Sequence, residues 1–234
     1  MTETLIELAL AIIAGVLAIT LHEAAHGYAA LALGDTTAKE AGRLSLNPLR
    51  HVDRVGTLLI PGFLLITQLL LPPHRVTFMF GWAKPVPIAP WRFRDPRRGM
   101  ALVALAGPAM NVFLAWVAAL LMPDTAGQGS EFRAMETQFL FYFMLSNLVL
   151  GLFNLLPIPP LDGGRVAVGL LPLDLARRWA GLERYGILIV LGLVFLLPRL
   201  TGFDPVGEVL RTVLPWAFRT IFMLAGHDLN GPTF

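Results

Sequence analysis

One short motif inside the first apolar stretch constrains this chain more than any other feature. Residues 22–26 read HEAAH, and they lie within the apolar residues 6–33. Histidines four residues apart project from one face of a helix, close enough to share a tetrahedral metal ion, and the adjacent glutamate can accept a proton from water. The motif therefore predicts a metal site with hydrolytic chemistry, carried by His22, Glu23 and His26.

The stretch around the motif is long enough to cross a membrane. Residues 6–33 are apolar apart from Glu7, Thr20 and the motif itself, and a spanning helix needs about 20 residues. Ionisable groups in such a helix are costly and usually mark a function. A chance match to a five-residue pattern is the alternative, and the membrane context makes it the less favoured one.

The composition indicates the same class of protein. Hydrophobic residues make up 56% of the chain, charged residues 15%, and the mean hydropathy is +0.66, whereas soluble domains are more polar. We expect one membrane-embedded domain over residues 1–234, with a catalytic core at 5–172 and a C-terminal span and amphipathic helix at 173–234. The net charge of +2 favours no nucleic-acid partner. The absence of cysteine excludes thiolate zinc ligands and a cysteine nucleophile.

The apolar pattern predicts an all-α polytopic membrane protein with about five to six membrane helices. Pro61-Gly62 and basic residues on both flanks favour a re-entrant hairpin at 52–71, with one ordinary spanning helix as the alternative. Polar residues recurring over 204–219 predict an amphipathic helix kinked near Pro215. The expected apolar stretches are 6–33, 52–71, 100–122, 139–156 and 185–197.

Basic residues set the expected orientation. No lysine or arginine precedes Lys39, so we expect the first helix to be retained rather than cleaved as a signal peptide. Residues 39–54 contain four basic residues, Lys39, Arg43, Arg50 and Arg54, which places this connector in the cytoplasm. The sequence thus predicts a multi-pass protein of the cell membrane with the HEAAH motif towards the cytoplasmic side.

An extended segment is expected at residues 80–88, FGWAKPVPI. Pro85 and Pro87 disfavour a helix, and an extended or β-like segment near the site would pair with an extended substrate peptide. The alternative is an interfacial loop anchored by Trp82 and Trp91, and the sequence on its own favours that loop.

A third metal ligand is predicted in residues 153–165, FNLLPIPPLDGGR. Three prolines end the preceding helix and present Asp162 on a break in the chain, and a zinc hydrolase needs three protein ligands and an open position. Gly163 and Gly164 allow a tight turn there. Alternatively, Asp162 only caps a helix at 164–171.

The sequence predicts less specific roles for Asn111 and for three further histidines. Asn111, in the GPAMN sequence of residues 107–111, either forms an interhelical hydrogen bond or supports the site. His51, His74 and His227 are expected to be solvated or interfacial rather than ligands.

Together these motifs resemble the site-2 protease family of intramembrane zinc metalloproteases. The resemblance covers residues 17–168 and rests on HEAAH, GPAMN and FNLLPIPPLDGGR, while FGWAKPVPI and NPLRHVDRVGT are similar to its compact bacterial branch. Residues 123–133 are too short to hold the PDZ insert of larger relatives, and we expect no C-terminal CBS pair.

The resemblance implies a role for each candidate residue and a kind of substrate. His22, His26 and Asp162 would bind Zn²⁺, and Glu23 would be the general base. Asn154 would contact the substrate backbone or the developing oxyanion, with Asn111 in support. The implied substrate is a transmembrane segment within the lipid bilayer; no oligomeric state is indicated.

Two other functions fit part of the pattern. Intramembrane histidine and carboxylate groups also occur in metal-ion transporters and metal-binding membrane proteins. Transporters often contain an internal repeat with paired broken helices, and this chain has one HEAAH motif and one proline break. An inactive relative that binds helices would not need Glu23 and all three ligands.

Overall fold

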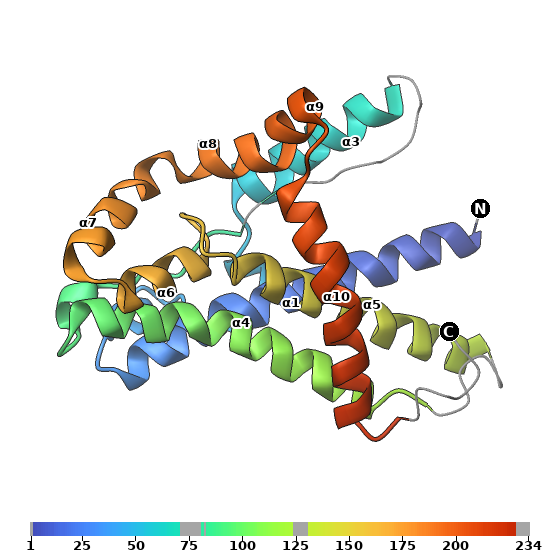
Figure 1. Ribbon diagram of the computed structural model, residues 1–234. Helices are drawn as coiled ribbons and strands as arrows, with labels where there is room; N and C mark the ends of the chain where they lie inside the picture. Colours follow the sequence, from blue (N-terminus) through green and yellow to red (C-terminus); the bar gives the residue numbers. More distant parts are fainter. Residues whose placement is uncertain (1, 71–80, 82, 124–130, 228–234) are drawn as a thin grey trace.

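The computed structural model describes residues 2–70, 81, 83–123 and 131–227, and every regular element among them is helical. This confirms the predicted all-α class (Figure 1). The helices are α1 (Thr2–Ala32), α2 (Thr37–Glu40), η1 (Pro48–Arg50), η2 (Arg54–Leu59), α3 (Ile60–Leu70), η3 (Pro90–Arg92), α4 (Pro96–Leu120), α5 (Glu131–Asn154), α6 (Asp162–Leu170), α7 (Leu173–Gly181), η4 (Glu183–Tyr185), α8 (Gly186–Leu191), η5 (Gly192–Leu196), α9 (Leu197–Thr201) and α10 (Pro205–Leu224).

Four helical segments are long and apolar enough to cross a membrane. They are Leu5–Ala32, Pro96–Leu120, Phe132–Asn154 and Leu173–Thr201. The predicted spans at 6–33, 100–122, 139–156 and 185–197 are therefore confirmed, although the last one begins earlier because α7, α8 and α9 follow one another with little interruption. The expected total of about five to six membrane helices included the segment at 52–71; the described residues contain four candidate spans and the shorter apolar helix Arg54–Gln68.

The hairpin predicted at 52–71 is wrong for the part of it that the structure describes. Arg54–Leu70 is one helical run that changes from π-helix to α-helix at Ile60, and it is shorter than a candidate span. Pro61 is the second residue of α3. Because η2 leads directly into α3, Pro61 lies inside this run, one residue after the change from π-helix to α-helix.

The predicted extended segment is present without β-structure. Ala83–Ala89 has no regular secondary structure, while Phe80 and Trp82 lie outside the described residues. Pro85 and Pro87 carry no N–H and cannot donate to a strand ladder, which explains why a strand was the wrong prediction.

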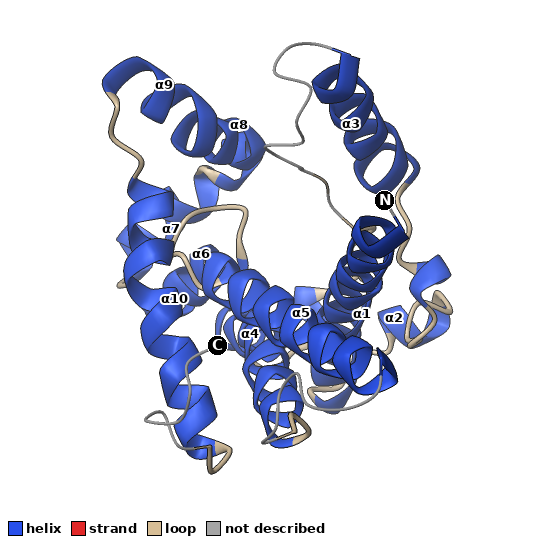
Figure 2. Ribbon diagram, turned by 90° about the vertical axis from the view of Figure 1, so that its right-hand side faces the viewer, coloured by secondary structure: helices blue, strands red, loops and turns tan. Residues whose placement is uncertain are grey.

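Helices α1, α4 and α5 form the packed centre of the molecule. Figure 2 shows α3 and the α8–α9 run above these three helices, on opposite sides of the view. The buried side of α1 carries small residues such as Ala14, Ala18 and Ala30, whereas Ile12 and Ile13 are exposed. Small residues let membrane helices approach closely, and large apolar side chains then face the lipid.

Helix α10 completes the packing on α4 and α5. Its Ile221 and Phe222 join a buried cluster with Met144 of α5 and Ala115 of α4. The helix begins after Asp204, whose carboxylate accepts a hydrogen bond from the Gly207 N–H. The amphipathic helix predicted at 204–219 is thus confirmed as a longer helix that contains Pro215.

The short helix α6 is held against α4, and this contact determines where Asp162 lies. A Cβ atom on Gly169 would come within 2.3 Å of the Ala101 Cβ, so the two helices approach at van der Waals distance only because glycine occupies that position. Asp162 is the first residue of α6, and the packing on α4 brings it beside α1.

Candidate metal centre and active site

Three side chains from two distant parts of the sequence converge at the middle of the helix bundle. His22 and His26 of α1 and Asp162 of α6 are all buried. The two Nε2 atoms are 3.1 Å apart, and the Asp162 Oδ2 atom lies 3.1 Å from His22 Nε2 and 3.3 Å from His26 Nε2. Tetrahedral zinc with bonds of about 2.0–2.1 Å places neighbouring ligand atoms about 3.3 Å apart, so the three distances match such a site.

Hydrogen bonds at the Nδ1 atom of each imidazole ring determine whether its Nε2 atom can bind a metal ion. His22 Nδ1 lies 2.6 Å from Asn111 Oδ1, and His26 Nδ1 lies 2.7 Å from the Val103 carbonyl oxygen. Both partners are acceptors, so both Nδ1 atoms donate, and each neutral ring then presents a lone pair at Nε2.

The converging atoms therefore need a cation between them. Two lone pairs and a carboxylate oxygen face one another, and Asp162 Oδ2 is buried without a hydrogen-bond partner of acceptable geometry. A buried group of this kind is costly unless something compensates it. A proton on one ring would satisfy one contact, whereas a divalent metal ion satisfies all three. The donor set of two imidazoles and one carboxylate is typical of catalytic zinc.

A buried amide pair extends from His22 into α5. The amide group of Asn111 donates from Nδ2 to Asn147 Oδ1 over 2.8 Å, and Asn147 donates from its own Nδ2 to the Phe143 carbonyl oxygen over 2.8 Å. Asn111 and Asn147 are both 0% exposed. Because a carbonyl oxygen only accepts, the Phe143 contact sets the orientation of both amides and directs Asn111 Oδ1 at His22.

Asn147 is a residue that we did not identify from the sequence. The available signal was an asparagine in the middle of the apolar stretch 139–156, because polar groups at membrane depth usually have a partner or a function. Asn111 was identified, and its hydrogen bond with His22 shows that its two predicted roles coincide: it bonds between helices at the site.

Changing Asn147 to leucine is expected to weaken zinc binding by roughly 10-fold. Losses of this size are typical when a residue that helps to orient a metal ligand through hydrogen bonds is removed. The substitution leaves Asn111 Nδ2 without its acceptor, so the amide is no longer held towards His22. Zinc affinity measured by competition with a chromogenic chelator checks this. Thr137→Val is the matched control, since the Thr137 hydroxyl bonds only to its own helix, at the Arg133 carbonyl. Equal affinities for the Asn147→Leu and wild-type proteins would contradict the orienting role.

Gly107 of α4 makes room for the two imidazole rings. A Cβ atom at this position would lie 2.5 Å from His26 Nε2 and 2.6 Å from His22 Cε1, well inside the distance that carbon and nitrogen atoms tolerate. Gly107, the first glycine of the GPAMN sequence, is therefore required because α4 packs closely against the face of α1 that carries His22 and His26.

Gly107→Ala should accordingly displace the imidazoles and lower zinc affinity by at least about 10-fold, because a misplaced ligand loses bonding geometry. Zinc content after dialysis, measured by inductively coupled plasma mass spectrometry, gives the result. Gly15→Ala is the control in the other helix of this contact, since no atom lies within 4 Å of its added Cβ. Full zinc content in Gly107→Ala would show that the contact can relax.

The loop before Asp162 differs from the predicted tight turn. Gly163 and Gly164 lie in the first turn of α6, and neither is among the glycines with positive φ. A Cβ on Gly163 would come within 2.2 Å of the Leu155 carbonyl oxygen, and one on Gly164 within 2.7 Å of the Pro159 nitrogen. The glycines therefore permit close packing of α6 on its own connector. Capping by Asp162 is also wrong, because Leu161 occupies the N-cap position.

Glu23 follows His22 in α1, next to the candidate metal ligands, and contacts the extended segment. Its Oε2 atom accepts a hydrogen bond of 3.2 Å from the Val86 N–H. No partner of Glu23 Oε1 is found among the residues that the structure describes, and the side chain is only partly buried. Glu23 thus combines a held oxygen with one that is available to a water molecule.

The remaining polar residues considered in the sequence analysis are Asn154 and three histidines. Asn154 is the last residue of α5 and donates from Nδ2 to the Leu150 carbonyl oxygen over 3.0 Å, so its side chain is bonded to its own helix. His51 is 3% exposed and bonds through Nε2 to the Ser45 carbonyl oxygen, so its ring is buried rather than solvated. Among the described residues it is not part of the group that could hold a metal ion. His227 bonds to the Ala119 carbonyl oxygen, and His74 lies outside the described residues.

Comparison with known proteins agrees with this geometry. Residues 123–198 match the model of Peptidase family M50. The chain is 38% identical over 180 residues to "Putative zinc metalloprotease YwhC" of Bacillus subtilis, a match covering 75% of each protein. It is 31% identical over 225 residues to "Putative zinc metalloprotease Rip2" of Mycobacterium tuberculosis, covering 94% of this chain and 74% of the relative. No solved structure gives a significant match. The chain belongs to peptidase family M50, the site-2 protease family of zinc metalloproteases.

Proposed function

We propose that this M50 protein is an intramembrane endopeptidase that hydrolyses peptide bonds within or near transmembrane segments of other membrane proteins. The observation that carries the proposal is the convergence of Asp162 on His22 and His26, which lie with Glu23 on a helix long enough to span a membrane. A hydrolytic site at this depth meets only those peptide bonds that enter the bilayer.

The proposed location is a bacterial cell membrane, with the site towards the cytoplasm. His22 and His26 lie in the half of α1 that ends at Ala32, next to the basic connector of residues 39–54. Basic connectors usually remain in the cytoplasm, and the similar proteins named above are bacterial. We further propose that residues 1–234 act as one membrane-embedded domain, which the packing of α10 on α4 and α5 supports.

In the proposed mechanism, His22, His26 and Asp162 would hold a zinc ion, which when bound would supply Lewis-acid polarisation of the scissile carbonyl and would lower the pKa of the attacking water. Glu23 accepts the proton of that water at Oε1 and then passes it to the departing amine. Asn111 keeps the His22 ring oriented through its Nδ1 hydrogen bond. Burial of the three ligands keeps bulk solvent away from the reacting groups.

The substrate must be at least locally extended to react. A spanning helix hides its carbonyl groups in hydrogen bonds, and Ala83–Ala89 offers irregular backbone next to Glu23. We propose that an unwound stretch of substrate pairs with this segment, as peptides do when they add to an exposed edge. Asn154 would contact the substrate backbone after exchanging its present bond with the Leu150 carbonyl oxygen.

The test is a search for new peptide ends. Purified wild-type protein and the Glu23→Gln variant are each incubated in detergent with a mixed pool of synthetic transmembrane segments, and products are identified by mass spectrometry. Fragments that form only with the wild-type protein support the proposal and reveal the sequence preference. No fragments from a zinc-loaded wild-type protein would favour the metal-transporter function, which zinc flux in proteoliposomes then measures.

A further inference from the structure

The segment Ala83–Ala89 lies directly on the helix that carries Glu23. Val86 is buried, and its N–H donates to Glu23 Oε2 over 3.2 Å. One turn further along α1, a Cβ on Gly27 would come within 3.2 Å of Val86 Cγ1. The absence of a side chain at Gly27 thus lets Val86 reach the helix surface. Glu23 Oε2 therefore keeps its hydrogen bond only while the Val86 N–H stays at this position on α1.

Each end of the segment is anchored to the connector that follows α1. At the first end, Lys84 donates its N–H to the His51 carbonyl oxygen over 2.8 Å, and Arg43 donates to the Lys84 carbonyl oxygen over 2.7 Å. At the other end, the Ala89 N–H donates to Asp35 Oδ2 over 2.6 Å. The two anchors differ in their surroundings, because Lys84 is exposed whereas Asp35 and Ala89 are buried.

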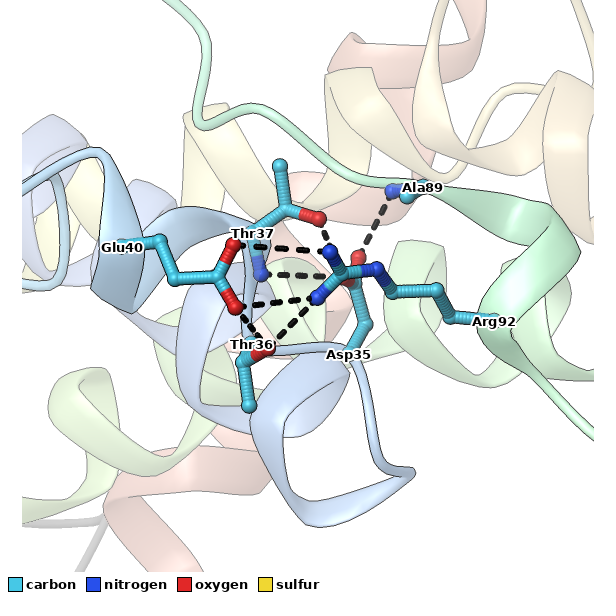
Figure 3. A network of polar contacts seen from close by, with 6 residues as sticks. All are labelled: Asp35, Thr36, Thr37, Glu40, Ala89 and Arg92. Carbon is cyan, nitrogen blue, oxygen red and sulfur yellow. Dashed lines mark hydrogen bonds and ion pairs between the residues drawn. The ribbon is translucent and has the colours of Figure 1, made fainter.

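Asp35 is the centre of the second anchor. Its side chain is 0% exposed, and while Oδ2 holds Ala89, Oδ1 accepts from the Thr37 N–H over 3.0 Å (Figure 3). The Arg92 Nε atom lies 3.9 Å from Oδ1. Burial by itself would raise the pKa of the Asp35 carboxyl, but the hydrogen bonds from Ala89 and Thr37 outweigh it and hold the pKa below its ordinary value. The carboxylate therefore remains charged and binds both chain segments at once.

Arg92 joins the same cluster at the surface. Its guanidinium contacts both oxygens of Glu40, at 3.2 and 3.4 Å, and also bonds to Thr36 (Figure 3). The Arg92 side chain is 37% exposed, and exposed ion pairs of this kind contribute little to stability. They nevertheless connect η3, which begins at the residue after Ala89, with α2 and its N-cap Thr36, and so help to fix the position of Ala89.

A short stretch of backbone links Ala89 to Val86. The two residues are three positions apart, a span of at most about 10 Å in an extended chain. Pro87 lies between them and Pro85 precedes Val86, and proline fixes φ near −65°. Pro87 therefore removes one of the rotations by which the intervening backbone could absorb a displacement of Ala89, and part of such a displacement is passed to Val86.

We propose that Asp35 is a positioning residue for Glu23: by holding the Ala89 N–H it keeps the Val86 N–H on Glu23 Oε2, and so directs Glu23 Oε1 at the attacking water. This rests on the role of Glu23 given under the proposed function. Asp35 touches neither substrate nor metal. Its loss slows proton transfer by Glu23 and leaves zinc binding unchanged, because the polar contacts of His22, His26 and Asp162 among the described residues are with Asn111, Val103 and one another rather than with Asp35.

The first measurement compares Asp35→Asn with wild-type protein in cleavage of a peptide found in the search for new peptide ends. Asparagine has the same shape but one acceptor oxygen, so it cannot hold both Ala89 and Thr37. We expect kcat to fall by roughly 10-fold to 100-fold, since small misplacements of a reacting group have effects of this size. The KM should stay within about twofold and zinc affinity should be unchanged. Asp204→Asn is the matched control, because Asp204 also accepts a backbone N–H, at α10, far along the chain.

A second measurement separates positioning from general destabilisation. In the Glu23→Gln background, Asp35→Asn should have no further effect on the residual rate, because Asp35 acts through Glu23. Hydrogen exchange followed by mass spectrometry should be faster at residues 83–89 in Asp35→Asn and unchanged in α1 and α4. If Asp35→Asn does not fold, Arg92→Gln at the exposed rim is the substitute, with a smaller kcat loss in the same direction and the same exchange pattern.

Three results would overturn the proposal, and they are distinguishable. An unchanged kcat in Asp35→Asn, with the wild-type protein active and Glu23→Gln inactive, refutes the positioning role alone. Equal losses from Asp35→Asn in the wild-type and Glu23→Gln backgrounds show that Asp35 acts independently of Glu23. Equal cleavage by wild-type and Glu23→Gln proteins refutes the proposed function, and the positioning role with it.

Discussion

Replacing Glu23 with glutamine is expected to reduce peptide hydrolysis by a factor on the order of 10³, while zinc stays bound. General acid–base catalysis contributes roughly 10²–10⁴-fold, and glutamine cannot accept a proton at physiological pH. The substitution is isosteric, and the Glu23 carboxylate is not among the three groups that converge on the metal position. The Val86 N–H can still donate to the glutamine carbonyl oxygen, so the extended segment should remain in place. Turnover of a defined peptide and zinc content are measured on the same preparation.

Glu7→Gln is the matched control for this experiment. Glu7 lies in the same helix, and its carboxylate accepts a hydrogen bond from Gln138 Nε2 at a distance of 3.1 Å. The same chemical change at this position should leave turnover and zinc content as in the wild-type protein. A Glu23→Gln protein with wild-type turnover would remove Glu23 from the mechanism, whereas a loss of zinc would show that the carboxylate also supports the metal.

Replacing Asp162 with alanine is the second change with a large expected effect, and it acts on zinc itself. Removal of a residue that hydrogen-bonds to a metal ligand typically lowers metal affinity by roughly 10–100-fold. Removal of a direct ligand should therefore lower zinc affinity by more than about 100-fold and abolish turnover. His22 and His26 would remain as a pair, which is too few protein ligands for a stable catalytic site.

Thermal unfolding provides a measurement independent of catalysis. A ligand that binds only the folded state raises stability by RT ln(1 + [L]/Kd), so zinc should raise the Tm of the wild-type protein and have little effect on Asp162→Ala. The apo variant should fold, because the substitution removes one of three mutually repelling acceptors. Asp174→Ala, at an exposed acid in the first turn of α7, is the control and should keep the full zinc-dependent shift. An equal shift in Asp162→Ala would refute Asp162 as a ligand.

Features that depend on neighbours along one helix were predictable from the sequence. The spacing of His22 and His26 places them on one face of any helix, whatever surrounds it. The lengths of the apolar stretches predicted the four spans, because the bilayer thickness sets them. Asp162 was identified as the partner of the histidines because three prolines must end a helix wherever they occur.

Features that depend on how helices pack were decided only by the tertiary structure. The hydrogen bond between Asn111 and Asn147 joins residues 36 positions apart, and the one between Val86 and Glu23 joins residues 63 positions apart. Neither pair has a spacing that a helical period selects.

The physical reason is the difference between local and long-range constraints. Periodicity and proline placement act through the covalent chain within a few residues. The rotation and separation of α1, α4 and α5 are decided by how all their side chains fill the space between them, including the missing Cβ atom of Gly107. The sequence by itself thus determined which residues are the candidates for the chemistry, and the packing of the helices decided which groups hold and orient them.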